Sequence, residues 1–356
     1  MKRILVTGSG GVGGVNFVRA LRLAEEKMYI VGTDYNIYHL QFPDVDARYR
    51  TPKHTDPSFI PRINEIIEKE SIQFVHPDAE VEAVVISKFR DRVKAKVFLP
   101  SYEAMEVCED KLLTAERLAP RNLAPKTIHV KSVEDVDRAF EELGSPIWLR
   151  LKSGAGGVGG LRCDNPEEAK IWMEIWVRKK NRRVDEFIAQ EYLPGRDFAW
   201  DSFWADGKLL FSYTRERLEY AFKHLTLSGV AGTPSVSRIV HDDRVNEVGY
   251  EAVKAIDPKP HGFYSVDLKE DASGGVKVTE VGAKLHTTFS LWSYAFAKVF
   301  GKEEYNVPYA YVKLAFGEEP PELTPFNAFP EGYYLLRHID VGAFLWREDG
   351  WKAKIL

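Results

Sequence analysis

The sequence predicts an α/β unit at the N-terminus followed by α+β units, with a ligand-binding cleft between them. Apolar runs and helical patterns alternate early in the chain, strands and turns dominate later, and 356 residues exceed one ordinary core. We place a boundary near residue 105 and expect three parts, residues 1–105, 106–300 and a C-terminal extension of 301–356. Ligands prefer the clefts between such parts.

The first part alternates between β and α patterns. Residues 2–7 form a short apolar run, a glycine-rich turn follows, and residues 15–26 carry apolar side chains at helical spacing. The further expected elements are strands at 29–33, 72–76 and 95–99 and helices at 58–70 and 102–118. This alternation is typical of a parallel, doubly wound sheet.

The later part has short strands separated by turns. Two strands, at 146–152 and 160–163, flank a glycine-rich segment, and a helix is expected at 166–178. The remaining expected elements are strands at 187–192, 198–204, 208–213, 262–269 and 276–281, a helix at 242–256, and a hairpin at 333–339 and 342–346. This mixture predicts α+β architecture.

Composition limits the partners. The chain is 44% hydrophobic and 29% charged with a net charge of -4, so no basic field attracts nucleic acid or a membrane surface. No apolar stretch approaches the roughly 18 residues of a membrane span, and we expect a cytoplasmic protein. Cys108 and Cys163 lie far apart without CxxC spacing, which argues against a disulfide framework or a zinc site.

The first glycine loop, residues 8–14 (GSGGVGG), joins a strand to a helix. Exposed amides and the helix dipole can hold an anion there, and Asp34 at the end of the next strand completes a dinucleotide-like pattern. The alternative is that these glycines only permit a tight turn. An NAD(P)-dependent epimerase or reductase would also need a Tyr-x-x-x-Lys pair, and the match at Tyr309 and Lys313 lies very late in the chain.

The second glycine segment, residues 153–160 (SGAGGVGG), lies between two expected strands and lacks the Gly-Lys-Ser/Thr of a P-loop. Its flexible backbone amides can close over phosphates, and Arg150 and Lys152 supply positive charge just before it. A plain hairpin would need only one or two glycines. We therefore expect a phosphate-binding flap.

A hairpin near the end of the second part carries two carboxylates. If Lys269 pairs with Val276, Asp267 lies opposite Val278 and diagonal to Glu280, and both carboxylates share one face within about 7 Å. Such a pair can bind magnesium that bridges nucleotide phosphates. A solvated hairpin face is the alternative, but Glu280 lies in an otherwise apolar strand.

These elements, in this order, resemble the ATP-grasp superfamily, in particular the carbamoyl-phosphate-synthase-like carboxylate–amine ligases. The resemblance covers roughly residues 2–300. It implies an ATP-grasp fold with an N-terminal Rossmann-like pre-ATP-grasp domain, a small lobe at about residues 125–188 with the flap, and a larger C-terminal lobe. On this resemblance the first glycine loop holds substrate or only shapes the fold, and no NAD is needed.

The resemblance also implies roles for individual residues. The nucleotide-binding positions are Lys111, Arg150, Lys152, Ser153, Gly154, Gly156, Gly157, Gln190, Glu191, Tyr192, Leu193 and Asp197. Arg215 and Lys284 fall on positions that meet the transferred phosphate or acyl phosphate, and Asp267 and Glu280 on the metal ligands. The chain departs from the family pattern where Gly282 replaces an asparagine, Lys284 an arginine and Leu151 a proline.

The expected reaction follows from the resemblance. MgATP, with Mn²⁺ as an alternative metal, would lie between the lobes, and a substrate carboxylate would become an acyl phosphate that an amine displaces. No histidine is placed by a motif as a general base. A decayed nucleotide-binding regulator is the third alternative beside the ligase and the NAD(P) enzyme. Dimers are common among such enzymes, so a homodimer is allowed, but the sequence indicates no interface.

Overall fold

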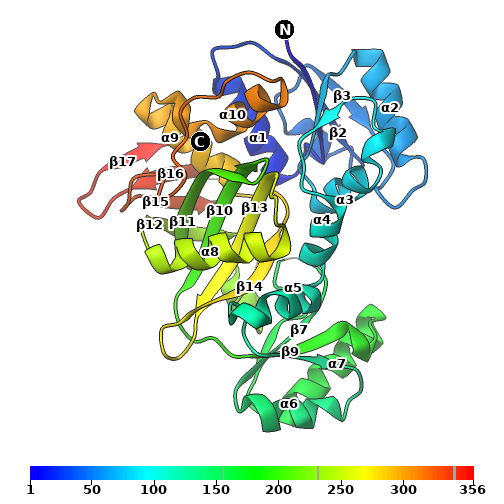
Figure 1. Ribbon diagram of the computed structural model, residues 1–356, viewed down its shortest axis with the longest axis vertical. Coiled ribbons are helices and arrows are strands. Elements are labelled where there is room, and N and C mark those ends of the chain that lie inside the picture. Colours follow the sequence, from blue (N-terminus) through cyan, green and yellow to red (C-terminus); the bar gives the residue numbers. More distant parts are fainter. Residues whose placement is uncertain (155, 231, 340–341) are drawn as a thin grey trace.

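The strands of the protein form three sheets. The computed structural model describes residues 1–154, 156–230, 232–339 and 342–356. Figure 1 shows an N-terminal unit at the upper right, a large central sheet, and a small unit at the bottom that carries helices α6 and α7. This mixed α/β architecture agrees with the predicted fold class.

The N-terminal sheet is parallel, with strand order β3-β2-β1-β4-β5. Its elements are β1 (Arg3–Thr7), α1 (Val12–Leu23), β2 (Tyr29–Asp34), β3 (Ala47–Arg50), α2 (Phe59–Glu70), β4 (Phe74–Pro77), α3 (Glu80–Lys88) and β5 (Lys96–Val97). Successive residues of β1 face opposite sides of the sheet. Leu5 shares a core with α2, whereas Ile4 and Val6 share one with α1. Helices therefore cover both faces, as the alternating pattern predicts.

The helix expected at residues 102–118 is two helices, α4 (Tyr102–Glu109) and α5 (Lys111–Leu118). Asp110 between them is extended, and its carboxylate accepts hydrogen bonds from the backbone N–H groups of Leu112 (2.8 Å) and Leu113 (3.3 Å). An aspartate N-cap starts a new helix. The break places Lys111 in the first turn of α5, beside the small unit.

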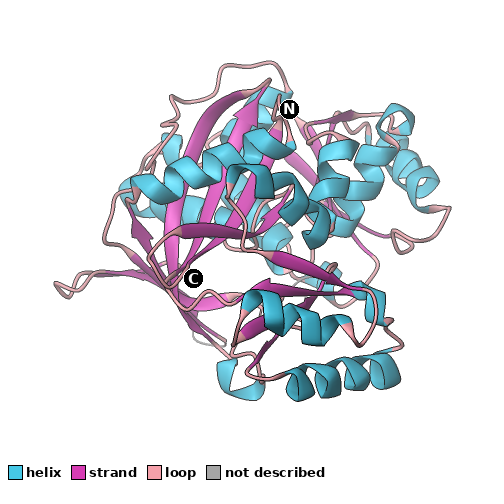
Figure 2. Ribbon diagram, turned by 60° about the horizontal axis from the view of Figure 1, so that its bottom comes forward, coloured by secondary structure: helices cyan, strands magenta, loops and turns pink. Residues whose placement is uncertain are grey.

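The small unit is a four-stranded sheet with order β6-β9-β7-β8. Its elements are β6 (Thr127–Val130), α6 (Asp135–Leu143), β7 (Ile147–Leu151), β8 (Leu161–Cys163), α7 (Pro166–Lys180) and β9 (Phe187–Glu191). Both helices lie on one side of the strands (Figure 2), where Val136 and Met173 share a core with Ile147 and Leu149. The second glycine segment connects β7 to β8.

The large sheet has eight strands in the order β14-β13-β10-β11-β12-β15-β16-β17. Its elements are β10 (Asp197–Ala205), β11 (Lys208–Tyr220), β12 (Pro234–Val240), α8 (Asp243–Ile256), β13 (Gly262–Glu270), β14 (Val276–Gly282), β15 (Tyr334–His338), β16 (Gly342–Trp346) and β17 (Lys352–Lys354). Helix α8 covers one face, where Val245 and Val253 share a core with Trp200 and Val266. The neighbouring residue Asp267 therefore points to the opposite face.

Several elements differ from the sequence predictions. Strand β11 continues to Tyr220 instead of ending near residue 213, and the predicted C-terminal hairpin joins the large sheet because β15 pairs with β12. Helices α9 (Phe289–Phe300) and α10 (Val307–Ala315), which pack near α1, were not predicted. Short 3₁₀ helices lie at His39–Gln41, Arg90–Arg92, Ala119–Arg121, Val184–Glu186, Lys223–Leu225 and Glu303–Tyr305.

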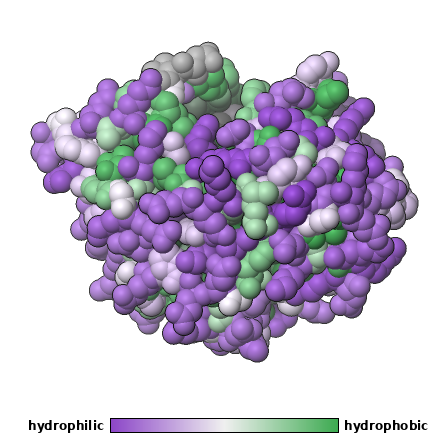
Figure 3. Space-filling view, turned by 90° about the horizontal axis from the view of Figure 1, so that it is seen from above, coloured by the Kyte–Doolittle hydropathy of each residue, from purple (hydrophilic) through white to green (hydrophobic). Residues whose placement is uncertain are grey.

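The face seen in Figure 3 is mainly hydrophilic, with apolar side chains in scattered groups. None of the helices in the described part of the chain has the length and apolar character needed to cross a bilayer.

Candidate active site

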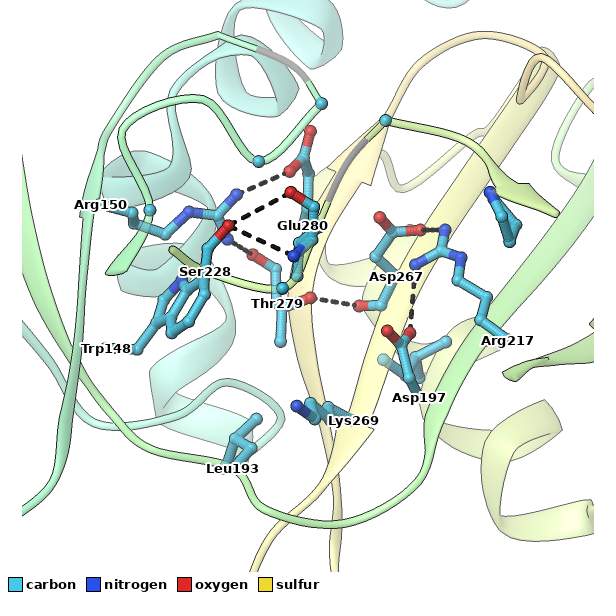
Figure 4. A pocket seen from close by; sticks show the side chains of 18 of the residues that line it. Trp148, Arg150, Leu193, Asp197, Arg217, Ser228, Asp267, Lys269, Thr279 and Glu280 are labelled. Carbon is cyan, nitrogen blue, oxygen red and sulfur yellow. Dashed lines mark hydrogen bonds and ion pairs between the residues drawn. The ribbon is translucent and has the colours of Figure 1, made fainter. Parts of the chain in front are cut away.

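A cavity of about 660 Å³ lies between the small unit and the face of the large sheet that α8 leaves free. Its lining comes from β7 and β9 on one side and from β11, β13 and β14 on the other. Gly156 and Gly157 of the second glycine segment line it, as do residues 226–230 of the connection after β11. Figure 4 shows the interior of this cavity.

Cations from two different elements converge on Glu280. Arg150 on β7 donates a hydrogen bond to its carboxylate (Nη2 to Oε2, 2.9 Å) and another to the carbonyl of Thr279 (3.2 Å). The ammonium of Lys111, almost fully buried, lies 3.4 Å from Oε1 of Glu280. The sequence predicted these three residues for the site, and the structure brings them together.

The predicted register of the carboxylate hairpin is wrong. Asp267 pairs directly with Glu280, not with Val278, because a bulge shifts the register between Asp267 and Leu268 and leaves Thr279 as the extra residue of β14. Directly opposed residues are closer than the diagonal neighbours expected from the sequence. In Figure 4 both side chains enter the cavity, Glu280 toward Arg150 and Asp267 toward Arg217.

Arg217 is a site residue for which the sequence suggested no role. Its guanidinium donates hydrogen bonds to Asp267 and to Asp197 (Nη1 to Oδ1, 3.2 Å). Burial alone would raise the pKa of Asp267, but the charges of Arg217 and His286 lower it instead. Arg217 follows Arg215 by two residues on β11, so strand periodicity could have placed both on one face.

His286 links the cavity to a buried carboxylate. Its Nδ1 lies 2.6 Å from Asp201 and its Nε2 lies 3.1 Å from Asp267. Burial lowers the pKa of His286, but the charges of Asp201 and Asp267 raise it by more, so the pKa lies above its usual value. This favours an imidazolium that donates to both carboxylates. Arg215 also pairs with Asp201, through Nε at 3.2 Å. The predicted Arg215 and its partner Asp201 therefore form the buried part of this charge network.

Lys284 lies at another wall of the cavity and pairs with Glu80, at the start of α3, with Nζ and Oε2 3.1 Å apart. Burial lowers the pKa of Lys284, but Glu80 and Asp78 raise it overall. A β-carbon at Gly282 would lie 3.5 Å from Oε1 of Glu80. Glu80 therefore lies where a longer side chain at position 282 would extend.

The residues predicted for the adenine hinge line one end of the cavity, Gln190 and Glu191 on β9 and Tyr192 and Leu193 after it. Gln190 is 3% exposed, and its side chain donates to the Thr127 hydroxyl at 3.0 Å. Asp197 lines the same cavity. Figure 4 shows Leu193 below Trp148 and Lys269, which line the cavity as well.

The second glycine segment adopts conformations that favour glycine. Gly154, Gly156 and Gly157 have φ of 112°, 72° and 74°. The ammonium of Lys111 donates to the Gly154 carbonyl at 2.7 Å. Lys111, Lys152, Ser153 and Gly154 are not among the described residues that line the cavity, although Lys111 contacts Glu280 from behind. Residue 155 lies outside the described residues.

Carboxylates surround the first glycine loop. The backbone N–H of Gly10 donates to Asp34 (3.2 Å), and a β-carbon at Gly13 would lie 2.5 Å from an Asp78 oxygen. Burial raises the pKa of nearby Glu82 to about 7. A pyrophosphate would meet these carboxylates, so the geometry argues against the dinucleotide interpretation. The Tyr309–Lys313 pair does not supply the catalytic residues of that class either. The Tyr309 hydroxyl donates a hydrogen bond to Glu26, where α10 packs near α1.

The two hairpin carboxylates have the chemistry of a magnesium site. Mg²⁺ prefers oxygen ligands, keeps several waters, and is commonly held by one or two carboxylates together with nucleotide phosphates. In the described part of the chain, no three His, Cys, Asp or Glu side chains are arranged to hold a metal by themselves. Asp267 and Glu280 therefore fit a metal bound jointly with phosphates, not a closed protein site.

Sequence comparisons give distant relatives. A scan of protein-family models finds no match. The chain is 22% identical over 341 residues to the mitochondrial arginine-specific large chain of carbamoyl phosphate synthase from Neurospora crassa, a match that covers 93% of this chain and 28% of that protein. It is 24% identical over 193 residues to the N-terminal section of the large chain from Aquifex aeolicus, with coverages of 49% and 34%. The matches span about a third or less of the length of these curated relatives.

Solved structures match over nearly the whole chain. The L-amino acid ligase of Bacillus licheniformis has a TM-score of 0.72 at 15% identity, with coverages of 94% of this chain and 80% of that one. The ADP complex of N5-carboxyaminoimidazole synthetase from Staphylococcus aureus has a TM-score of 0.68 at 15% identity and covers 95% of this chain and 82% of that one. The MgADP complex of a biotin carboxylase domain from Hydrogenobacter thermophilus has a TM-score of 0.66 at 15% identity and covers 94% of this chain and 73% of that one. The chain shares the overall fold of these three proteins, and the resemblance to the ATP-grasp superfamily predicted this fold.

Proposed function

We propose that the chain is an ATP- and Mg²⁺-dependent ligase that activates a carboxylate as an acyl phosphate and transfers it to an amine. The convergence of Lys111 and Arg150 on Glu280, opposite Asp267, is the observation that carries this proposal. Such an arrangement neutralises the charge of a transferring phosphoryl group and positions its oxygens. The distant similarity to carbamoyl phosphate synthase supports the same chemistry.

On this proposal the three parts of the chain have separate tasks. Residues 1–105 are the Rossmann-like pre-ATP-grasp domain, residues 106–300 the ATP-grasp domain and residues 301–356 an extension. Residues 153–160 act as the flap, whose amides close over the phosphates together with Lys152. Residues 190–193 and Asp197 hold the adenosine end, because they line the same cavity as Asp267 and Glu280.

The proposed metal is Mg²⁺, held by Asp267 and Glu280 with the nucleotide phosphates. When bound, it neutralises phosphate charge. One structural neighbour is a MgADP complex, whereas the comparisons do not support Mn²⁺. Arg150 and Lys111 hold Glu280 in place from the opposite side.

The chain's own residues contribute mainly alignment. Arg215 and Lys284 meet the anionic oxygens of the activated acid, because both line the cavity beside Asp267 and Glu280. Orienting reactants and excluding water accounts for much of the rate in phosphoryl transfer. We assign no side chain as a general base.

The test is phosphate release from ATP by the purified protein, with Mg²⁺ and a panel of carboxylates and amines. Release that depends on both partners supports the ligase. ATP binding without turnover across the panel would favour the decayed regulator. A change in nicotinamide absorbance would favour the NAD(P) enzyme, which the geometry of the first glycine loop disfavours. A cytoplasmic location and a homodimer stay predictions; one structural neighbour is a dimer.

A further inference from the structure

Asp267 and Glu280 form one row of side chains across the hairpin of β13 and β14, and the next row of this hairpin contains no acid. Asp267 pairs with Glu280, and two residues further along Ser265 pairs with Gly282. Residues two apart on a strand share a face. Ser265 and Gly282, which we call the second row, therefore lie beside the two carboxylates, and both line the cavity.

The second row offers no free side-chain oxygen to a metal ion. Gly282 has no side chain. The hydroxyl oxygen of Ser265 lies 2.8 Å from Oδ1 of Asp201 and 2.8 Å from the carbonyl of Lys284. It also accepts a hydrogen bond from the backbone N–H of His286 at 3.1 Å. Asp201 itself is fully buried and is not among the described residues that line the cavity.

The N-terminal unit fills the space that Gly282 leaves. Glu80, the first residue of α3, lines the cavity, and its Oε1 lies 3.5 Å from the place of a β-carbon at residue 282. Its other oxygen, Oε2, lies 3.1 Å from the ammonium of Lys284. A cation that the protein itself supplies therefore lies at the second row, where a further metal ion would need oxygen ligands.

The other carboxylates among the described residues that line the cavity lie away from the second row. Asp197 pairs with Lys269 on β13, so it lies beyond Asp267 as seen from Ser265. Glu191 belongs to β9 of the small unit, on the opposite wall of the cavity. The second row therefore has one carboxylate in the cavity, and that carboxylate already contacts an ammonium.

We propose that the site takes one divalent cation per nucleotide, at Asp267 and Glu280, and that the ammonium of Lys284 takes the place of a second one. Glu80 is the positioning residue that fixes this ammonium, which is a compact charge on a flexible stem. Phosphoryl transfer needs positive charge around the phosphates, and lysines supply it as metal ions do. This inference rests on the proposed function and specifies the number of its metal ions.

The test counts metal ions by equilibrium dialysis of the wild-type protein. Mn²⁺ serves as a countable substitute for Mg²⁺, together with a non-hydrolysable ATP analogue. Free Mn²⁺, free analogue and their complex reach equal concentrations in both compartments, so the excess on the protein side gives the bound metal and the bound nucleotide. We expect a ratio of about one metal ion per nucleotide that stays constant as free Mn²⁺ rises.

Two variants test the lysine and its partner. Lys284→Gln removes the ammonium and should weaken binding of the analogue at least about tenfold. This loss should shrink as free Mn²⁺ rises, because the carboxylate of Glu80 is then free to accept a second ion. Glu80→Gln keeps the ammonium without its fixed position and should lose part of the affinity while the ratio stays at about one.

The matched control is Lys277→Gln on the same strand, because Lys277 donates to the backbone carbonyl and the side chain of Asn122, both at 2.8 Å, and is not among the described residues that line the cavity. This variant should keep the wild-type affinity and ratio. A ratio of about two in the wild type, or an unchanged affinity in Lys284→Gln, overturns the inference and leaves the proposed function intact. Absence of nucleotide-dependent Mn²⁺ binding in the wild type would instead count against the proposed function.

Discussion

Replacing Glu280 with glutamine tests the centre of the proposed site. The change keeps the side-chain volume and removes the charge that Arg150 and Lys111 contact at 2.9 and 3.4 Å. The fold should persist, because Thr279 still accepts from Arg150 and Gly154 still accepts from Lys111. Phosphate transfer should fall at least about 10²-fold, since a carboxylate needed for the metal and for cation placement is lost.

The cost in stability follows from the exposure of the three side chains. Glu280 is 27% exposed, Arg150 14% and Lys111 4%, so the charges are partly screened. Charge-assisted hydrogen bonds contribute about 1.5–3 kcal/mol, and discounting for solvent leaves a loss of about 1–2 kcal/mol. We expect a Tm lower by about 2–4 °C.

The assays are ATP-dependent phosphate release and a Mg²⁺ titration in the presence of ADP. Glu270→Gln is the matched control, because Glu270 belongs to the same hairpin and pairs with two arginines, Arg196 and Arg244. It should lose similar stability and keep phosphate release. An active Glu280→Gln protein with unchanged Mg²⁺ affinity would refute the metal assignment. An equal loss of phosphate release in Glu280→Gln and Glu270→Gln would show that the loss comes from lower stability and not from the metal site.

Four further predictions follow from the site. Gly282→Asn should preserve or raise Mg²⁺ affinity by restoring an oxygen near Glu280. Weaker Mg²⁺ binding in a titration would show that the position is kept clear for Glu80, whose Oε1 lies 3.5 Å from the place of a β-carbon at residue 282. Hydrogen exchange with a non-hydrolysable ATP analogue should show protection around residues 150–162, 190–193 and 280 and little change at residues 8–14, whereas NAD should protect none of these segments; the reverse pattern would support the dinucleotide enzyme. Arg217→Gln leaves two carboxylates without their shared cation and should lower the free energy of unfolding by about 3 kcal/mol in urea, against less than about 1 kcal/mol for the exposed Arg244→Gln control. Because burial raises the pKa of Glu82 from 4.5 to about 7, the folded state holds a proton that the unfolded state has lost. Stability should fall as pH rises across this window, and Glu82→Gln should make the difference between unfolding at about pH 5 and about pH 8 smaller by the share that Glu82 contributes.

The sequence predicted the parallel N-terminal sheet and most strands of the large sheet because their apolar periodicity is local. The helices α9 and α10 were missed because the prediction depends on this apolar periodicity. In α9 the consecutive residues 289–293 and 295–297 are all buried, so burial runs round the helix and the polar face that pattern analysis needs is narrow. The break at Asp110 could have been found, because aspartate is a common N-cap.

The site shows where such prediction stops. Periodicity of two placed Asp267 on a face, but the bulge at Thr279 brings it directly opposite Glu280, and a bulge depends on contacts across strands. The same periodicity could have added Arg217 after Arg215 on β11, yet it says nothing about the partners of these arginines. Those partners come from β10, because Asp197 and Asp201 lie on the strand between β11 and β13. Strand order therefore decides which charges meet, and strand order is a property of the whole fold.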